Sequence, residues 1–398
     1  DAVVLAIDGQ GDWISTSLYV GEGRKLKKVD EYFVDQSLGF MYSRAARLLG
    51  LGKFGFGEGK LTALAAYGHP IKSFPNPVLI EGGRYRMAEK YYENTFVQFR
   101  TEKSKLLQEH KDFAATVQYN LEETVKHILT EAFGKYKKSN LAIAGGVALN
   151  CKMNGVLGAM PWVDSMYIQP AANDSGLCIG AAYLGASYLG DVPRKMQTVF
   201  LGPEIKGEDV AREVSRNNLS AKLVEDPSKL AADLLNKGKI VAWMQGRLEM
   251  GPRALGHRSL LGDPRSEKMK NRLNIIKQRE PWRPVAPSII HSDKNYCDLN
   301  EATEQMTKAI PMSELAIREI PGGVHVDGTA RVQHVKPSED RYFALVKHFE
   351  SITGVPAVLN TSLNACGEPL CNSIEDGIKF FYTTPTDNLI IGDWWFRK

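Results

Sequence analysis

The residues best suited to chemistry gather in one stretch, residues 245–265, which reads QGRLEMGPRALGHRSLLGDPR. Its first three glycines are each followed by an arginine, namely Arg247, Arg253 and Arg258, and His257 lies between the last two. Glycine lets backbone N–H groups approach a ligand closely, and the guanidinium fork matches phosphate or carboxylate oxygens. The stretch therefore predicts a polyanion site with these four side chains as catalytic candidates. A surface hairpin with solvated arginines is the alternative.

Two further segments offer polar groups near expected strands. Arg283 stands between two prolines, which restrict its backbone. A cation held in this way is better suited to a site than one on a helix surface, so Arg283 joins the catalytic candidates. An apolar run later in the chain ends in Asn360, Ser362 and Asn364, which are dense in hydrogen-bonding groups. A turn capped by its own Asn and Ser side chains is the alternative for this segment.

The N-terminal half carries a second kind of site. Asp8 follows an apolar run and precedes a hairpin. Actin-like ATPase folds open a phosphate or metal site in this way, and a plain Asp-Gly hairpin turn is the alternative. Gly145 and Gly146 follow another apolar run, and backbone N–H groups at the start of the next helix can hold a phosphate. Asn150 and Asn154 lie four residues apart, so they are expected on one face of that helix.

Weaker signals surround these positions. Asp174 precedes a helix rich in Ala and Gly, where it serves either as an N-cap or as a metal ligand. Glu58 and Lys60 open another short helix of small residues and are better candidates for contact than its alanines. Two strand–glycine–helix units in succession favour an α/β domain whose ligand binds at the strand ends.

The elements that must position these residues alternate along the chain. Apolar runs predict strands at residues 2–7, 14–21, 141–144, 165–170, 239–244, 354–359 and 388–396, with a charged turn at 21–30. Periodicity and end signals predict helices at 37–50, 58–68, 112–133, 209–218, 227–238, 266–280 and 373–384. A proline-rich segment at 191–205 indicates a linker. The sequence thus predicts two α/β domains, residues 1–192 and 193–398.

Composition excludes several classes of protein. The chain has 398 residues and a net charge of +4 without a long basic block, so nucleic acid is not an expected partner. It contains no run of about 18 apolar residues, so no membrane partner is expected either. Five scattered cysteines without metal spacing indicate a reducing, cytoplasmic compartment. The chain starts inside an apolar run, and we therefore expect a further segment upstream of Asp1.

Several blocks, taken in order, resemble the O-carbamoyltransferase family. They are DGQGD, SLGFMY, GEGKLTALAAYG, AGGVALNCKMNG, NDSGLCIGAAYLG, GRLEMGPRALGHRSLLGDPR, REPWRPVAPS, RVQHV and VLNTSLNACGEPL. The resemblance implies an actin-like ATPase (ASKHA-type) domain followed by a YrdC-like α/β domain. In the family, the YrdC-like domain makes carbamoyl-adenylate from carbamoyl phosphate and ATP. The other domain then transfers the carbamoyl group to a hydroxyl of a small molecule, as in natural-product biosynthesis.

The resemblance also implies roles for the residues named above. The arginines would stabilise the charge at the α-phosphate while the adenylate forms. The residues that would bind the nucleotide or the carbamoyl group are Gly145, Gly146, Asn150, Asn154, Glu58, Lys60, Asn360, Ser362 and Asn364. Asp8 and Asp174 match the family's metal-binding aspartates, for Fe²⁺ or Mg²⁺.

One departure from the family and several alternatives remain. The family's metal-binding histidines lie upstream of the DGQGD block and are absent from this sequence, so we expect an incomplete metal site. The expected partners are a hydroxylated small-molecule acceptor, a second copy of the chain in a homodimer, and the upstream segment. The alternatives are a threonylcarbamoyl-type tRNA-modification enzyme and an inactive nucleotide-binding fragment. The acceptor itself is beyond the reach of the sequence.

Overall fold

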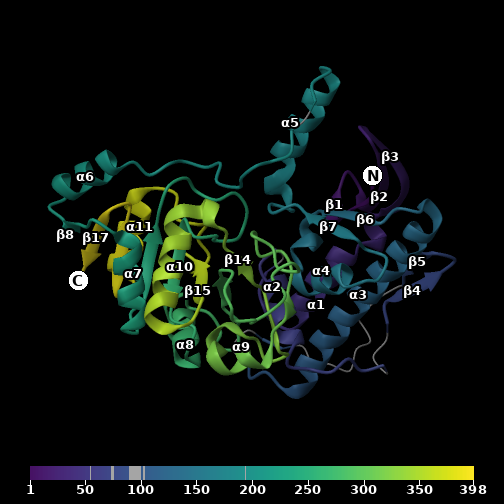
Figure 1. Cartoon of the computed structure of the whole chain (residues 1–398). Coiled ribbons are helices and arrows are strands. Elements are labelled where there is room, and N and C mark those ends of the chain that lie inside the picture. The colour runs from purple at the N-terminus through teal and green to yellow at the C-terminus, as the bar shows by residue number, and fades with distance from the viewer. Residues whose placement is uncertain (54, 73–75, 89–99, 102–103, 193) are drawn as a thin grey trace. The chain divides into compact units, whose positions relative to one another are not determined.

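The computed structural model describes residues 1–53, 55–72, 76–88, 100–101, 104–192 and 194–398. The chain divides into two compact units, Asp1–Pro193 (unit 1) and Arg194–Lys398 (unit 2) (Figure 1). Each unit contains one main β-sheet together with several helices, so the predicted α/β class is confirmed. Within the described ranges, every helix is too short or too polar to cross a lipid bilayer.

Unit 1 is built on a five-stranded sheet. Its strand order is β3 (Lys25–Phe33), β2 (Ile14–Glu22), β1 (Ala2–Gly11), β6 (Asn140–Ala144) and β7 (Ser165–Ile168). The first three strands pair antiparallel, whereas β6 and β7 run parallel to β1. The charged turn expected at 21–30 is wrong, because the turn is confined to Gly23 and Arg24. The lysines that follow belong to an edge strand whose exposed side chains suit a sheet edge.

The helices of unit 1 confirm most of the periodic predictions, and the last of them has no buried residue along its described length. They are α1 (Leu38–Leu48), α2 (Glu58–Ala65), α3 (Gln108–Tyr136), α4 (Cys151–Gly158) and α5 (Leu177–Tyr188), with short 3-10 turns at Val34–Gln36, Gly146–Leu149 and Asp174–Gly176. Ser37 caps α1 by accepting the N–H of Phe40 at 3.0 Å. The apolar stripe of α3 is buried as expected. The excursion at 71–111 contains the hairpin β4 (Val78–Glu81) and β5 (Arg84–Met87), and parts of it lie outside the described residues.

Unit 2 is built on an eight-stranded sheet. Its order is β14 (Gln333–His334), β11 (Ala286–Ile289), β15 (Ala357–Ser362), β10 (Arg258–Gly262), β9 (Val241–Met244), β16 (Asn388–Ile391), β17 (Trp394–Arg397) and β8 (Ala221–Leu223). A small ribbon pairs β12 (Ile310–Pro311) with β13 (Thr329–Ala330). The helices are α6 (Gly207–Arg216), α7 (Pro227–Asn236), α8 (Glu267–Ile276), α9 (Glu314–Glu319), α10 (Asp340–Thr353) and α11 (Ile374–Thr383).

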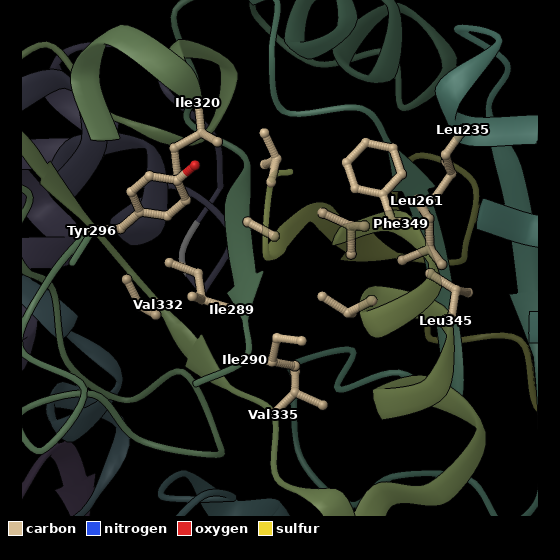
Figure 2. Packing of buried hydrophobic residues seen from close by; sticks show 14 of the residues in the cluster. Leu235, Leu261, Ile289, Ile290, Tyr296, Ile320, Val332, Val335, Leu345 and Phe349 are labelled. Atoms are coloured by element: carbon tan, nitrogen blue, oxygen red, sulfur yellow. The ribbon is translucent and has the colours of Figure 1, made fainter. Parts of the chain in front are cut away.

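The centre of the sheet of unit 2 is buried on both faces, because alternate residues of its strand β9 enter two different cores. Val241 and Trp243 pack in one core with Leu345 and Phe349 of α10, and Figure 2 shows part of this cluster. Ala242 and Met244 enter the other core with residues of α8 and α11. A strand that is covered on both faces reads as a continuous apolar run, as the expected strand at 239–244 does.

Three expected boundaries in unit 2 are wrong. The stretch 245–265 is not a loop throughout, because β10 begins at Arg258 with five consecutive buried residues. The basic helix ends at Ile276 instead of Glu280. The last strand is two strands, since Gly392 turns the chain with φ +58°.

The segment expected as a linker also forms backbone pairs with the rest of unit 2. Its part from residue 199 onward pairs with residues 246–250 through backbone hydrogen bonds such as Ile205 N–H to Gly246 O at 3.0 Å.

Candidate functional site

The glycine–arginine loop of residues 245–257 meets the polar end of β15. Strands β10 and β15 are antiparallel neighbours, and Ser259 lies opposite Ser362. The N–H of Leu363 then donates to the carbonyl of Arg258 at 3.0 Å. The start of β10 and the end of β15 therefore lie at one edge of the sheet, which brings together two segments about 100 residues apart in the sequence.

A group of cations lies at the same edge, and two of its members were not among the sequence candidates. Lys277 Nζ donates to the carbonyl of Ser362 at 2.7 Å and to both oxygens of Asn364. Arg279 donates to Thr361 Oγ1 at 3.1 Å and to Ser362 Oγ at 3.4 Å. Helix α8 ends just before these two residues. Their side chains therefore leave the helix surface on which the sequence placed them.

These cations repel one another. Burial and the Arg279 guanidinium lower the pKa of Lys277 to about 6. Burial, then Arg283 and Arg331, lower the pKa of Arg279 to about 10. Burial also lowers the pKa of Arg283, against the opposing effect of the Glu280 carboxylate, 3.9 Å away. Like charges held together out of water favour an anion between them, so this cluster is a candidate site for phosphate or carboxylate oxygens.

The structure gives Arg258 surroundings that the sequence did not predict. Its side chain is fully buried. Nη1 donates to the carbonyl of Gln245 at 2.7 Å and to that of His257 at 3.0 Å, and Nη2 reaches the carbonyl of Pro203 at 3.4 Å. The guanidinium therefore ties three parts of the loop region together. Its predicted role against substrate stays untested, and its contacts are those of a positioning residue.

The other candidates of the loop differ in their surroundings. Arg247 donates to the carbonyl of Leu201 at 3.2 Å, and Arg253 lies half-buried at the loop tip. His257 Nδ1 donates to the carbonyl of Arg247 at 2.6 Å, and its ring stacks on Phe200 with centroids 3.7 Å apart. Burial lowers the pKa of His257, which favours the neutral ring. The catalytic roles of these three residues stay predictions.

Glu249 organises the loop and was missed by the sequence reasoning. This carboxylate is only 3% exposed. Its Oε1 accepts the N–H groups of Leu255 at 2.7 Å, His257 at 3.3 Å and Arg258 at 3.1 Å. A carboxylate among three arginines reads as a surface ion pair in the sequence, so no local signal marked it as the acceptor around which the backbone folds.

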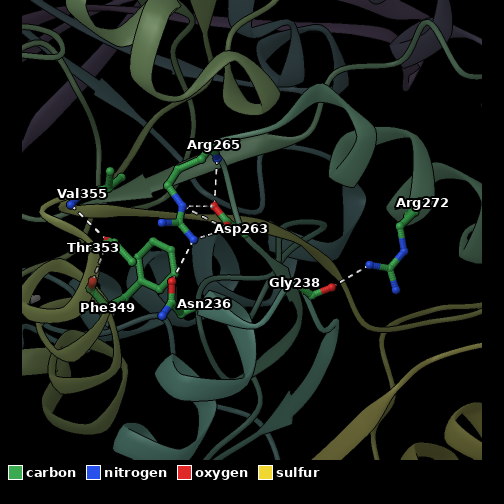
Figure 3. Close-up of polar contacts among 8 residues, drawn as sticks. All are labelled: Asn236, Gly238, Asp263, Arg265, Arg272, Phe349, Thr353 and Val355. Atoms are coloured by element: carbon green, nitrogen blue, oxygen red, sulfur yellow. Dashed lines mark hydrogen bonds and ion pairs between the residues drawn. The ribbon is translucent and has the colours of Figure 1, made fainter.

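Gly256 explains part of the glycine pattern. Its φ is +108°, and a Cβ on it would lie 2.3 Å from the Tyr342 ring. The glycine is therefore required by packing and conformation together. Arg265, the last residue of the stretch 245–265, is already paired. It bonds Asp263 at 2.7 Å and Asn236 at 2.9 Å, as Figure 3 shows.

Asn360 differs from its neighbours Ser362 and Asn364. It is 1% exposed, and its Nδ2 donates to Gln333 Oε1 at 3.0 Å and to the carbonyl of Ala254 at 3.2 Å. Asn360 thus attaches the loop to β15 from the interior. Ser362 and Asn364 lie in the cation cluster, and the ligand-binding prediction for all three stays open.

In unit 1 the structure brings Asp8 and the glycine pair together. Asp8 Oδ1 accepts the N–H of Gly9 at 2.6 Å, and Oδ2 accepts that of Gly146 at 2.7 Å. Gly145 has φ +94°, and a Cβ there would lie 2.1 Å from the carbonyl oxygen of Ile7. The segment after β6 can therefore cross the end of β1 only because it carries glycine.

The remaining nucleotide candidates of unit 1 are held by hydrogen bonds. A 3-10 turn at Gly146–Leu149 separates the glycines from α4, so the helix begins later than expected. Asn150 caps α4, and Asn154 is fully buried with its Nδ2 on the carbonyl of Ala148 at 2.7 Å. Glu58, at the start of α2 beside Lys60, accepts from Ser43 Oγ at 2.5 Å.

The predicted metal ligands are not joined by further ligands. Asp174 is exposed in its 3-10 turn, and both oxygens of Asp8 already accept N–H groups. In the part of the chain that the structure describes, no three His, Cys, Asp or Glu side chains are grouped so that they could hold a metal ion. The metal assignment of Asp8 and Asp174 therefore stays a prediction.

Comparisons with known proteins match both units. The carbamoyltransferase N-terminus model matches residues 1–183 and the carbamoyltransferase C-terminus model residues 232–398. Nodulation protein NolNO of Sinorhizobium fredii is 36% identical over all of this chain, which spans 61% of that relative. Nodulation protein NolO of Bradyrhizobium diazoefficiens is also 36% identical, and the chain spans 75% of it. A 3'-hydroxymethylcephem-O-carbamoyltransferase of Amycolatopsis lactamdurans is 31% identical over 85% of this chain and 65% of its own length.

Proposed function

Because the chain belongs to the carbamoyltransferase family, we propose that it serves an ATP-dependent O-carbamoyl transfer. Unit 2, as a YrdC-like domain, forms carbamoyl-adenylate. Carbamoyl phosphate loses its phosphate to water, a carbamate oxygen attacks the α-phosphorus of ATP, and pyrophosphate leaves. Unit 1, as an actin-like domain, presents the adenylate to a hydroxyl of a small-molecule acceptor. The hydroxyl oxygen bonds to the carbamoyl carbon, and AMP leaves.

The cation cluster at the end of β15 carries this proposal. Adenylate formation gathers negative charge on the α-phosphate, and fixed donors aimed at that charge lower the barrier. Arg279 and Arg283 provide such donors in a partly desolvated place. Lys277 holds the carbonyl of Ser362 and both oxygens of Asn364. The chain from Ser362 to Asn364 is thereby fixed against the cations.

Unit 1 supports the second step through its loop between β6 and α4. The N–H of Gly146 is oriented by Asp8, and Asn150 caps the helix that follows. The N-terminus of a helix favours phosphate oxygens, so this loop is the proposed place of the nucleotide. Fe²⁺ or Mg²⁺ belongs to the proposal through Asp8 and Asp174. We assign no step to a metal, since the ligands described do not complete a site.

Exchange of labelled pyrophosphate into ATP tests the first step. The full chain should catalyse exchange that depends on carbamoyl phosphate. No exchange by a folded chain counts against adenylate formation. Arg253→Ala should abolish the exchange if this arginine contacts the phosphates, and unaltered exchange would remove it from the site. Mass spectrometry of a panel of hydroxylated metabolites would then identify the carbamoylated acceptor.

A further inference from the structure

A pair of side-chain amides links α3 to the start of α4 in unit 1. Asn150 Nδ2 donates to Gln118 Oε1 at 2.9 Å, and Gln118 Nε2 donates to Asn150 Oδ1 at 3.2 Å. Both side chains are buried, at 4% and 8% exposed for Gln118 and Asn150. Such a pair would keep both bonds if each amide turned over, with every oxygen and nitrogen exchanged. Its direction must therefore be set by its neighbours.

Two neighbours set the direction at Gln118. The Tyr42 hydroxyl donates to Gln118 Oε1 at 2.6 Å. On the other side, Gln118 Nε2 donates to Glu122 Oε1 at 2.6 Å. An ionised carboxylate can only accept hydrogen bonds, so Glu122 requires the nitrogen end of the amide. A hydroxyl can donate or accept, so Glu122 is the neighbour that imposes one orientation.

The orientation of the pair reaches the backbone at α4. Asn150 Oδ1 also accepts the N–H of Met153 at 3.1 Å, which is the N-cap bond of this helix. With the pair reversed, Asn150 would present its NH₂ group to that N–H, and the cap would be lost. Asn150 directly follows the turn whose first N–H is held by Asp8. Asp8 and the cap thus fix the two ends of residues 146–150.

We propose that Glu122 is a positioning residue for the loop of residues 146–150, acting through Gln118 on the Asn150 cap. The inference rests on the proposed role of this loop in holding a nucleotide. Glu122 touches no reacting group. It determines whether the loop is held in the one conformation that the Asn150 cap and Asp8 fix.

The surroundings of Glu122 make its charge state matter. Burial raises the pKa of this carboxyl, and Glu123 acts in the same direction. The Gln118 hydrogen bond, Lys152 on α4 and Lys126 on α3 oppose them. The phenol of Tyr42 on α1 also faces this group. A protonated Glu122 could donate to Gln118 and would release the amide to turn over, so the cap should loosen as the pH falls.

Substitutions at both ends of the Gln118–Glu122 bond test the proposal. Glu122→Leu removes the acceptor, and Gln118→Glu sets two carboxylates against each other. The double variant Gln118→Glu with Glu122→Gln restores a donor and an acceptor between positions 118 and 122, but it leaves the Asn150 amide oxygen facing a carboxylate oxygen, so the cap stays loose. Glu123→Gln is the matched control, because this half-buried neighbour on α3 carries the same charge and pairs with Lys126. Its loss would lower the pKa of Glu122, which keeps that carboxylate ionised and the cap in place.

Hydrogen exchange of peptides covering residues 145–158 in the full chain reports the cap directly. An N-cap is worth about 1 kcal/mol, or roughly fivefold in an equilibrium. Each of the two single variants at 118 and 122 should exchange about fivefold faster there, and so should the double variant, while Glu123→Gln should match the unchanged chain. An unaltered rate in Glu122→Leu, or a double variant as slow as the unchanged chain, would overturn the proposal.

Nucleotide titration of the same variants keeps the two proposals distinguishable. If the loop holds the adenylate, the Kd for AMP, the leaving group of the transfer step, should rise about fivefold in Glu122→Leu, while carbamoyl-phosphate-dependent pyrophosphate exchange in unit 2 should stay unchanged. Faster exchange at residues 145–158 without any nucleotide affinity in unit 1 would reject the proposed function and leave the positioning role of Glu122 standing.

Discussion

The polar groups of the two candidate sites differ in how far they are already paired. In unit 1, Asp8 accepts two N–H groups, and Asn150 is bound to Gln118 and to the backbone. In unit 2, Lys277 and Arg279 lie beside further cations that lower their pKa values. The first arrangement is stable without a ligand, whereas the second leaves a repulsion that an anion would relieve. The polar side chains of unit 1 therefore fix a backbone conformation, whereas those of unit 2 form a concentration of positive charge.

The largest effect is expected from removing charge in unit 2. Arg279→Ala should lower carbamoyl-phosphate-dependent pyrophosphate exchange by about 100-fold or more, as loss of a fixed donor at a developing negative charge does. Arg212→Ala on α6 is the control, since this side chain is 68% exposed and pairs with Asp209. Equal exchange rates in the two variants would show that the cation cluster does not hold the reacting phosphates.

The next effect concerns Glu249, the carboxylate that accepts backbone N–H groups of the loop in unit 2. Glu249→Ala should lower the free energy of unfolding of unit 2 by about 3–5 kcal/mol, because it leaves three buried N–H groups without their acceptor and removes the carboxylate charge that favours the buried Arg258 cation. Glu249→Gln keeps one acceptor oxygen and should cost less. Urea unfolding measures both. Glu267→Ala, at an exposed ion pair with Lys270, should cost less than about 1 kcal/mol, and a similar loss in Glu249→Ala would refute the role given to Glu249.

Anion binding by unit 2 should depend on pH, because a buried lysine of its cation cluster changes its charge between pH 6 and 9. The pKa of Lys277 in the folded chain is about 6, below its ordinary value of 10.5. Above pH 6 this group is mostly neutral in the fold, so its contribution to stability rises with pH between these values. A bound anion raises the pKa of Lys277, so the amine of Lys277 takes up a proton when the anion binds. Sulfate, whose charge is constant in this range, should bind more weakly as the pH rises from 6 to 9.

Calorimetry in buffers of different ionisation enthalpy would measure that proton uptake. Lys277→Met should flatten the pH profile of sulfate binding and abolish the uptake. An unchanged profile would mean that another group titrates, and the separation between the two units would then lose its electrostatic basis.

The smallest effect is expected at Arg265. Its bond to Asp263 is partly open to solvent, at 36% side-chain exposure, so Arg265→Ala should cost about 1 kcal/mol or less of stability. Pyrophosphate exchange should stay unchanged, because the side chain is paired away from the cluster. A large loss of exchange would place Arg265 inside the site and widen the cationic region assigned to unit 2.

Local patterns predicted the elements better than the site. The stripe of α3 and the Ser37 cap depend on residues within a few positions of one another, and both are confirmed. Lys277 and Arg279 reach Ser362 only through the pairing of distant strands, which no local pattern encodes. The surroundings of Arg258 were not predicted for a related reason. An arginine beside glycines resembles a ligand contact in the sequence, whereas its fully buried guanidinium here binds carbonyl groups.

The surroundings of Arg258 also bear on the order in which unit 2 forms. Its carbonyl partners come from Pro203, Gln245 and His257, and they can converge only after the segment from residue 199 has paired with residues 246–250. Closing a loop of this length costs entropy before it is rewarded. The loop of residues 245–257 should therefore take its final shape after the main sheet has assembled. The proposed ability to bind substrate would then arise late in folding.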